Sequence, residues 1–249
     1  QRVFESASIP TNPRGTTTYY DGGDRIYVAG GVATVTRASW IEAVGVGNQS
    51  AAWEIYPIKP QLTAYILPFG ENLGFVDFNR VFVLVQATAD NTTFTVDLNG
   101  DGAADTLNQN RDADKTDPGD TATVTLQRGQ TFLLDRVSAC SSGTLCATNP
   151  GTLNAGVTIQ GSQTLQVKFV AGNPGQTYCA RGLSAFPRGF WTKDYYAPLD
   201  QPTGGAANTD YYLYNPQSSA ITIDWEARSG TGSSARRSSS TACWRRGSP

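Results

Sequence analysis

The side chains best suited to chemistry are concentrated in an acidic stretch, where seven aspartates lie within residues 97–120. Residues 97–102, Asp-Leu-Asn-Gly-Asp-Gly, fit the D-x-N-x-D-G opening of a calcium loop, in which alternate side-chain oxygens converge on the ion. Position seven of such a loop offers a backbone carbonyl, and position nine often binds through water. The pattern predicts a structural Ca²⁺ held by Asp97, Asn99, Asp101, Ala103 and Asp105.

The loop departs from the calcium pattern at its end. Position twelve is Asn108, where the pattern has a bidentate Glu, so we expect a weak affinity of about 0.1 to 1 mM. Replacement ligands are available further along the stretch at Asp112, Asp114, Asp117 and Asp120. The alternative is that Asn-Gly and Asp-Gly simply form a hairpin turn and the aspartates are solvated.

The cysteines suggest one disulfide. Cys140 and Cys146 flank a short polar loop that can close as a disulfide in an oxidising compartment. Two reduced thiols, or another pairing that includes Cys179 or Cys243, are the alternatives.

Catalytic chemistry is restricted because the chain contains no histidine, which excludes Ser-His-Asp and Cys-His arrangements. Glycoside hydrolysis needs only two carboxylates, but no glutamate stands in a pattern that singles it out. The sequence therefore predicts a protein that is not an enzyme, and a carbohydrate-active enzyme is the alternative. The glutamates considered for that alternative are Glu42, Glu54, Glu71 and Glu226.

Aromatic side chains gather in the last third of the chain. They can form a platform that stacks on sugars or binds a protein, because Tyr and Trp offer large rigid faces with polar tips. The alternative, which we prefer, is that these rings fill a β core and cover sheet edges. The residues are Phe190, Trp191, Tyr195, Tyr196, Tyr211, Tyr212 and Tyr214.

The elements that must position these groups are β-strands. Alternating or β-branched runs are separated by Gly, Asn, Asp and Pro turns, in units of about 44 residues with four runs each. This indicates an all-β, antiparallel fold of tandem four-stranded units that resemble propeller blades, with a β-sandwich as the alternative. The predicted strands are 25–29, 33–38, 52–58, 63–69, 81–87, 92–97, 121–126, 131–135, 156–160, 165–171, 182–187 and 194–199, and a fourth unit begins at Tyr211.

An internal similarity at an offset of about 130 residues supports a repeat architecture. Residues 26–37 have the same strand–turn–strand form as residues 157–168, and Tyr56-Pro57 corresponds to Phe186-Pro187. We therefore predict a lead-in over residues 1–24 and a repetitive β domain over residues 25–230. The basic, serine-rich residues 231–249 are predicted to be a disordered or aberrant tail.

Composition narrows the setting. Charged residues make up 16% of the chain, against about 25% in an average globular protein, which is typical of an extracellular all-β protein. The net charge of −2 provides no basic field for nucleic acid. The longest apolar run, Val81–Val85, is too short to insert in a membrane as a helix. We expect a piece of a larger multidomain protein.

Several passages resemble the family named for the N-terminal region of the IgG Fc-binding protein, whose bacterial members are secreted or surface proteins. The passages are residues 20–27, 91–97, 125–131, 165–171 and 214–216. The resemblance implies an extracellular or cell-surface binding or adhesive role, without known catalytic residues. The partner would be a protein or a glycan that the resemblance does not specify.

Overall fold

The computed structural model describes residues 25–39, 51–73, 80–110, 118, 120–135, 152–172, 180–196, 213–217, 219–227 and 236–242. Contacts within the chain define two compact units, Gln1–Gly204 and Gly205–Pro249.

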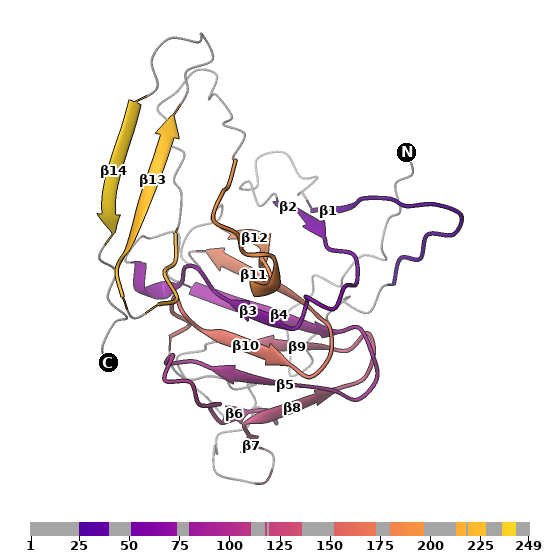
Figure 1. Ribbon diagram of the computed structural model, residues 1–249. Coiled ribbons are helices and arrows are strands. Elements are labelled where there is room, and N and C mark those ends of the chain that lie inside the picture. Colours follow the sequence, from indigo (N-terminus) through magenta and orange to yellow (C-terminus); the bar gives the residue numbers. More distant parts are fainter. Residues whose placement is uncertain are drawn as a thin grey trace, which may run out of the picture. The chain divides into compact units, whose positions relative to one another are not determined.

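The described residues are almost entirely strand and loop (Figure 1). No helix among them is long and apolar enough to cross a membrane. The first unit contains β1 (Val35–Ser39), β2 (Ala51–Ile55), β3 (Ala64–Ile66), η1 (Glu71–Leu73), β4 (Arg80–Ala87), β5 (Thr92–Asp97), β6 (Leu107–Asn108), β7 (Asp120–Thr121), β8 (Thr123–Leu126), β9 (Thr131–Leu134), β10 (Thr158–Gly161), β11 (Leu165–Gly172), β12 (Ala180–Ser184) and η3 (Arg188–Phe190). The second contains β13 (Ile221–Ala227) and β14 (Arg236–Ala242).

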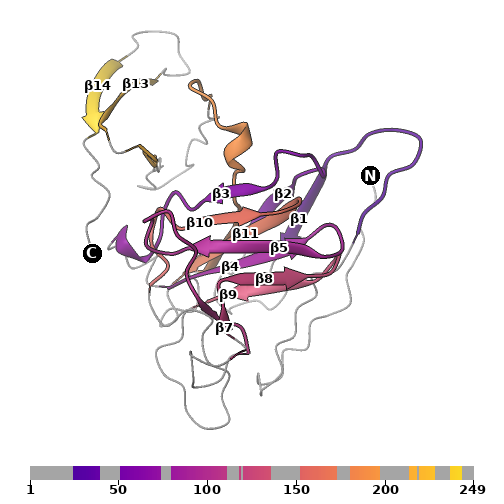
Figure 2. The same ribbon diagram turned by 60° about the horizontal axis from the view of Figure 1, so that its bottom comes forward.

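Two four-stranded antiparallel sheets form the body of the first unit, with strand orders β3-β10-β5-β8 and β12-β11-β4-β9. Figure 2 shows the two sheets as two layers. Their facing side chains form one hydrophobic core, in which Phe94 of β5 meets Phe132 of β9 edge-to-face at 5.5 Å between ring centroids. The predicted all-β antiparallel fold is confirmed.

The predicted blade-like units are not found among the described residues, and the arrangement is that of the alternative, a sandwich. Three pairs of successive strands, β4–β5, β8–β9 and β10–β11, each pass from one sheet to the other across a short turn. A blade would require four successive strands to pair with their neighbours. Alternating runs identify a strand with one buried face, but they do not identify its partner.

The alternation itself agrees with the sequence. β5 is buried at Thr92, Phe94 and Val96, and β11 is buried at every second residue from Leu165. Tyr65 of β3 is also buried, and its hydroxyl donates a hydrogen bond of 2.6 Å to the backbone oxygen of Leu165 in the opposite sheet.

The turns at one end of the sandwich are joined by side-chain hydrogen bonds. Asn91 and Gln127 bond to each other through backbone and side-chain groups, and Gln163 donates to the Asp90 carbonyl. The Asp90 carboxylate accepts from the Arg128 backbone N–H and lies 4.0 Å from its guanidinium. This end of the molecule is therefore held by polar contacts among its own turns.

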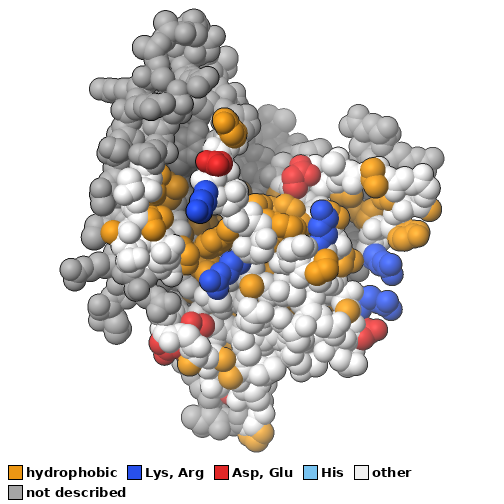
Figure 3. Space-filling view, in the orientation of Figure 1, with side chains coloured by type: hydrophobic (Ala, Val, Ile, Leu, Met, Phe, Trp, Pro, Cys, Tyr) orange, Lys and Arg blue, Asp and Glu red, His pale blue; other side chains and the backbone are white. Residues whose placement is uncertain are grey.

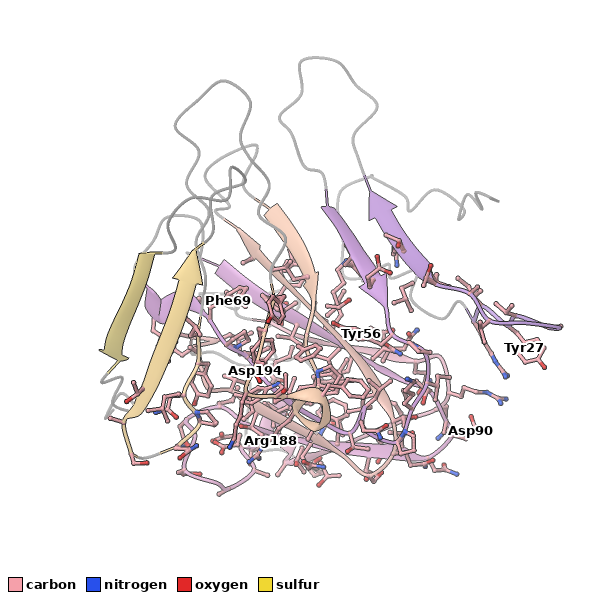
Figure 4. All side chains as sticks on the ribbon, turned by 45° about the horizontal axis from the view of Figure 1, so that its top comes forward. Tyr27, Tyr56, Phe69, Asp90, Arg188 and Asp194 are labelled. Atoms are coloured by element: carbon pink, nitrogen blue, oxygen red, sulfur yellow. The ribbon has the colours of Figure 1, made fainter. Side chains whose placement is uncertain are left out.

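The two segments that look alike in sequence have different structures. Residues 157–168 contain β10 and the first half of β11, one in each sheet. In residues 26–37, by contrast, residues 26–34 are exposed and outside any strand, and only residues 35–37 belong to a strand, β1. Figure 4 places Tyr27 on this extended segment, away from Tyr56 and Arg188. A strand–turn–strand form is too general to fix a tertiary position, because pairing depends on distant partners.

The second unit contains a two-stranded antiparallel sheet, β13–β14. Strand β14, of seven residues, falls inside residues 231–249, which the sequence predicts to be a disordered or aberrant tail. That this tail is aberrant stays a prediction. The backbone of this serine-rich segment pairs with β13. The segment has no apolar period, so its sequence pattern does not indicate a strand.

Candidate functional site

The structure brings the five predicted calcium ligands into one turn between β5 and β6. The Asp97 carboxylate accepts hydrogen bonds from the backbone N–H groups of Gly100, at 2.6 Å, and Gly102, at 2.9 Å. Both glycines have positive φ, 75° and 92°, a conformation that side chains disfavour. The side chains of Asn99, Asp101 and Asp105 accept N–H groups of the same loop.

These contacts give the carboxylates backbone partners in the structure. Among the described residues, no three His, Cys, Asp or Glu side chains form a group that could hold a metal ion. Calcium binding at this loop therefore stays a prediction. Asp112, Asp114 and Asp117 lie outside the described residues, whereas Asp120 begins β7.

The other sequence-predicted sites are separated or undescribed. Cys140, Cys146, Cys179 and Cys243 all lie outside the described residues, so the disulfide stays a prediction. Glu54 is exposed on β2, and the Glu71 carboxylate in η1 accepts the backbone N–H of Val81 at 3.1 Å. Glu42 lies outside the described residues, and Glu226 lies on β13 in the second unit.

A row of aromatic rings lies where the loop after β2 meets the segment after β12. Tyr56 and Phe186 meet edge-to-face at 6.3 Å between centroids, and Phe186 lies 6.2 Å from Phe190. The indole N–H of Trp191 donates to the Phe186 carbonyl at 3.3 Å. We call this surface the aromatic ledge and define it as Tyr56, Ile58, Phe186, Phe190 and Trp191.

Backbone contacts hold the ledge to the sandwich. Pro187 forms an isolated bridge with Tyr65 of β3, directly before η3. A Cβ added at Gly189 would lie 2.9 Å from the Cβ of Gln61, so only glycine allows η3 to come this close to the loop. The rings therefore stand on a support whose position is fixed by the core strand β3.

Two of the five ledge residues are exposed, and a positive charge lies beside the ledge. Ile58 is 59% exposed and Phe186 is 40% exposed. The other three are half-buried, and Tyr56 and Phe190 also pack against the hydrophobic core. The Lys59 ammonium lies 6.0 Å from the centre of the Phe190 ring. Figure 3 shows hydrophobic side chains gathered in the middle of one face, with Lys and Arg side chains among them.

A shallow hollow of about 390 Å³ adjoins the ledge. It is open to solvent and is lined by Ile58, Lys59, Pro60, Thr63, Gln163 and Thr164. Its polar groups come from the loop before β3 and from the β10–β11 turn. The hollow extends the ledge surface with hydrogen-bonding groups, and its shape differs from the enclosed cleft typical of small-molecule sites.

The sequence placed the aromatic surface only in part. Phe190 and Trp191 belong to the ledge, and Tyr195 follows on the same segment, where its hydroxyl accepts the Thr192 N–H at 3.0 Å. Tyr211 and Tyr212 lie outside the described residues, and Tyr214 belongs to the second unit. Tyr196 is fully exposed, so a purely structural role for these rings does not hold for every one of them.

The ledge residues before β3 could have been found from the sequence by one signal. Tyr56-Pro57 and Phe186-Pro187 are similar dipeptides at the repeat offset, and the structure places their two rings in contact. The similarity identified both positions, but it contained no information that they meet.

A second cluster, which the sequence did not indicate, lies on the outer face of the other sheet. The Lys168 ammonium of β11 stands 3.1 Å from the centre of the Trp53 ring of β2. Gln166 donates to the Tyr56 carbonyl at 2.7 Å, and Ser184 donates to the Glu54 carbonyl at 2.6 Å. These contacts attach β2 to the sheet and position the start of the ledge.

Gly182 of β12 makes room for this cluster. A Cβ added there would lie 2.8 Å from Cε of Lys168 and 3.4 Å from the Trp53 ring. Burial, and to a smaller extent the nearby Arg37 charge of β1, lowers the pKa of Lys168 to about 7. The indole face favours the charged amine and opposes this shift.

We expect this lysine to make stability depend on pH. The unfolded chain holds the proton up to about pH 10.5 and the folded chain releases it near pH 7, so unfolding free energy rises with pH between these values. Thermal melts of wild type and Lys168→Met between pH 6 and 9.5 measure this, and the variant should lose that rise. Lys59→Met, at an exposed position, should retain it, and equal slopes in wild type and Lys168→Met would contradict the assignment.

Comparison of this chain with known protein families, curated proteins and solved structures finds no match. The resemblance to the IgG Fc-binding family therefore stays a prediction.

Proposed function

We propose that this chain is a non-enzymatic binding module of a secreted or cell-surface protein, and that the aromatic ledge is its ligand surface. The observation that carries the proposal is a row of rings held to a core strand through the Tyr65–Pro187 bridge, with Phe186 exposed and its neighbours half-buried. Exposed apolar surface of this kind, with polar groups around it, marks interaction sites. The ligand is a glycan or a protein.

The chemistry of the surface supports binding over turnover. Rings with polar tips bind flat apolar faces, including those of sugars, at a low cost in conformational entropy. Glu54 is the acidic residue nearest in sequence to the Tyr56 end of the ledge. Its backbone carbonyl accepts a hydrogen bond from the Ser184 hydroxyl. Its side chain accepts a hydrogen bond from Thr36 at 2.7 Å, which gives it a structural role in the β1–β2 pair.

Binding to arrays of immobilised polysaccharides and surface proteins tests the proposal. We expect at least one ligand to be retained, and Phe186→Ala to weaken that binding at least about five-fold, as truncation of a binding hot spot does. Tyr27→Ala removes an exposed ring far from the ledge and should leave binding unchanged. Retention that is insensitive to Phe186→Ala, or release of cleaved sugar from a polysaccharide, would refute the proposal.

We also propose that Ca²⁺ stiffens the aspartate loop, on the basis of the D-x-N-x-D-G pattern. For a Kd of about 0.1 mM, 1 mM Ca²⁺ should stabilise the chain by about 1.4 kcal/mol, or about 3 to 6 °C in Tm, relative to excess chelator. Asp101→Ala should abolish the shift, and Asp194→Ala, outside the loop, should preserve it. An identical Tm with Ca²⁺ and with chelator would show that the loop does not bind Ca²⁺ and is only a turn.

A further inference from the structure

Three basic side chains surround the aromatic ledge. Lys59 lies over Phe190, Arg188 is exposed at the start of η3, and Lys193 is exposed two residues after Trp191. These three residues belong to the segments 56–63 and 185–194, whose one acidic residue is Asp194. The net charge of the two segments is therefore 3 − 1 = +2, whereas that of the whole chain is −2. The sign of the charge around the ledge is therefore opposite to that of the net charge of the chain.

These cations have no acidic partner within the described part of the chain. The ion pair found there joins Arg128 to Asp90 at the turn-rich end of the sandwich. An exposed cation next to an apolar surface remains hydrated until a partner with negative charge arrives. The charge of the ledge thus complements an anion that also presents apolar faces.

We propose that the ligand of the aromatic ledge is an acidic polysaccharide, one whose sugar rings stack on Phe186 and Phe190 and whose carboxylates meet Lys59 and Arg188. This inference rests on the proposed function. The open hollow fits a polymer that runs along the surface, because its Thr63, Gln163 and Thr164 side chains can bond sugar hydroxyls. A uronate polymer combines ring faces, hydroxyls and carboxylates in each residue.

Single-stranded nucleic acid also combines flat rings with negative charge, but the observations favour it less. It carries a phosphate at every nucleotide, and proteins that bind it use a positively charged groove along the backbone. A chain with a net charge of −2 and three local cations does not provide such a field. Oligonucleotide binding is therefore an outcome that the test must be able to report.

The test compares polymers that differ only in charge. Polygalacturonate, alginate and hyaluronate are each titrated calorimetrically into the full chain, next to the same polymer after methyl esterification of its carboxylates. We expect at least one acidic form to bind at least about ten-fold more tightly than its ester, and the difference to shrink as salt rises from 20 to 300 mM. Single-stranded oligothymidine and a poly-glutamate peptide complete the panel.

Charge-removing variants locate the effect. Lys59→Gln and Arg188→Gln should each weaken binding of the acidic polymer about two- to five-fold and leave binding of the ester unchanged, as expected for exposed charge pairs. Arg25→Gln removes the same charge on the extended segment that carries Tyr27, away from the ledge, and should have no effect. Circular dichroism of each variant checks that it is folded.

The outcomes separate this inference from the proposed function. If the esterified polymers bind as well as the acidic ones and depend on Phe186, the ledge is a binding surface and the inference about charge is wrong. Tighter binding of oligothymidine or poly-glutamate than of every polysaccharide also overturns it. If no polymer, protein or oligonucleotide depends on Phe186, both the inference and the proposed function fail.

Discussion

Replacement of Phe94 by Ala should destabilise the sandwich by about 3 to 5 kcal/mol, which corresponds to a fall of about 6 to 20 °C in Tm. Phe94 is 1% exposed, lies on the central strand β5, and contacts Phe132 of the opposite sheet. Truncation removes this ring from the junction of the two layers and leaves a cavity that neighbouring β-branched side chains cannot fill. Denaturant unfolding followed by tryptophan fluorescence measures the loss.

The matched control is Phe186→Ala, the same chemical change on the exposed ledge. Because Phe186 is 40% exposed, we expect less than half the loss found for Phe94→Ala. This comparison also shows whether the ledge variant used for binding remains folded. Equal losses in the two variants would contradict the assignment of Phe94 to the core and Phe186 to the surface.

Gly70→Ala should cost about 1 to 3 kcal/mol or more, because the added carbon has no space. A Cβ at Gly70 would lie 2.4 Å from the carbonyl carbon of Asn154 and from the carbonyl oxygen of Leu153. Both atoms belong to the backbone, so no side-chain rotation relieves the contact. The segment that continues β3 is bonded to the same stretch, where Glu71 donates to Leu153 at 2.9 Å.

The control for this backbone contact is Gly31→Ala. A Cβ at Gly31 meets nothing within 4 Å, and its φ lies outside the left-handed region that disfavours alanine. We expect a change within about 0.5 kcal/mol, or a small gain from a less flexible unfolded chain. If Gly70→Ala unfolds at the same denaturant concentration as wild type, the close approach of residues 67–71 to residues 153–157 is wrong.

The strands were largely predictable, and their partners were not. The predicted strand at 92–97 coincides with β5, and the prediction at 165–171 differs from β11 by one residue. Both have β-branched or large apolar residues at every second position, which is a local signal. The turns at 88–91 and 127–130 look like hairpin turns but connect the two sheets, and this depends on contacts between strands far apart in the chain.

The candidate site was predictable to a smaller extent. The calcium pattern at Asp97 is local and could be proposed directly from spacing. The ledge depends on the approach of Tyr56 to Phe186, and the second cluster depends on that of Trp53 to Lys168, residues separated by more than a hundred positions. Neither approach follows from periodicity, since each is set by how β2 lies on the sheet.

The most direct test of the account is amide hydrogen exchange of the chain with and without the ligand that binds most tightly in the array. We predict new protection confined to residues 56–63, 163–164 and 185–193, which contain the ledge, its cations and the adjoining hollow, with the extended segment around Tyr27 unchanged. Protection restricted to the aspartate loop at residues 97–105, or to the extended segment around Tyr27, would contradict the claim that the aromatic ledge is the binding surface.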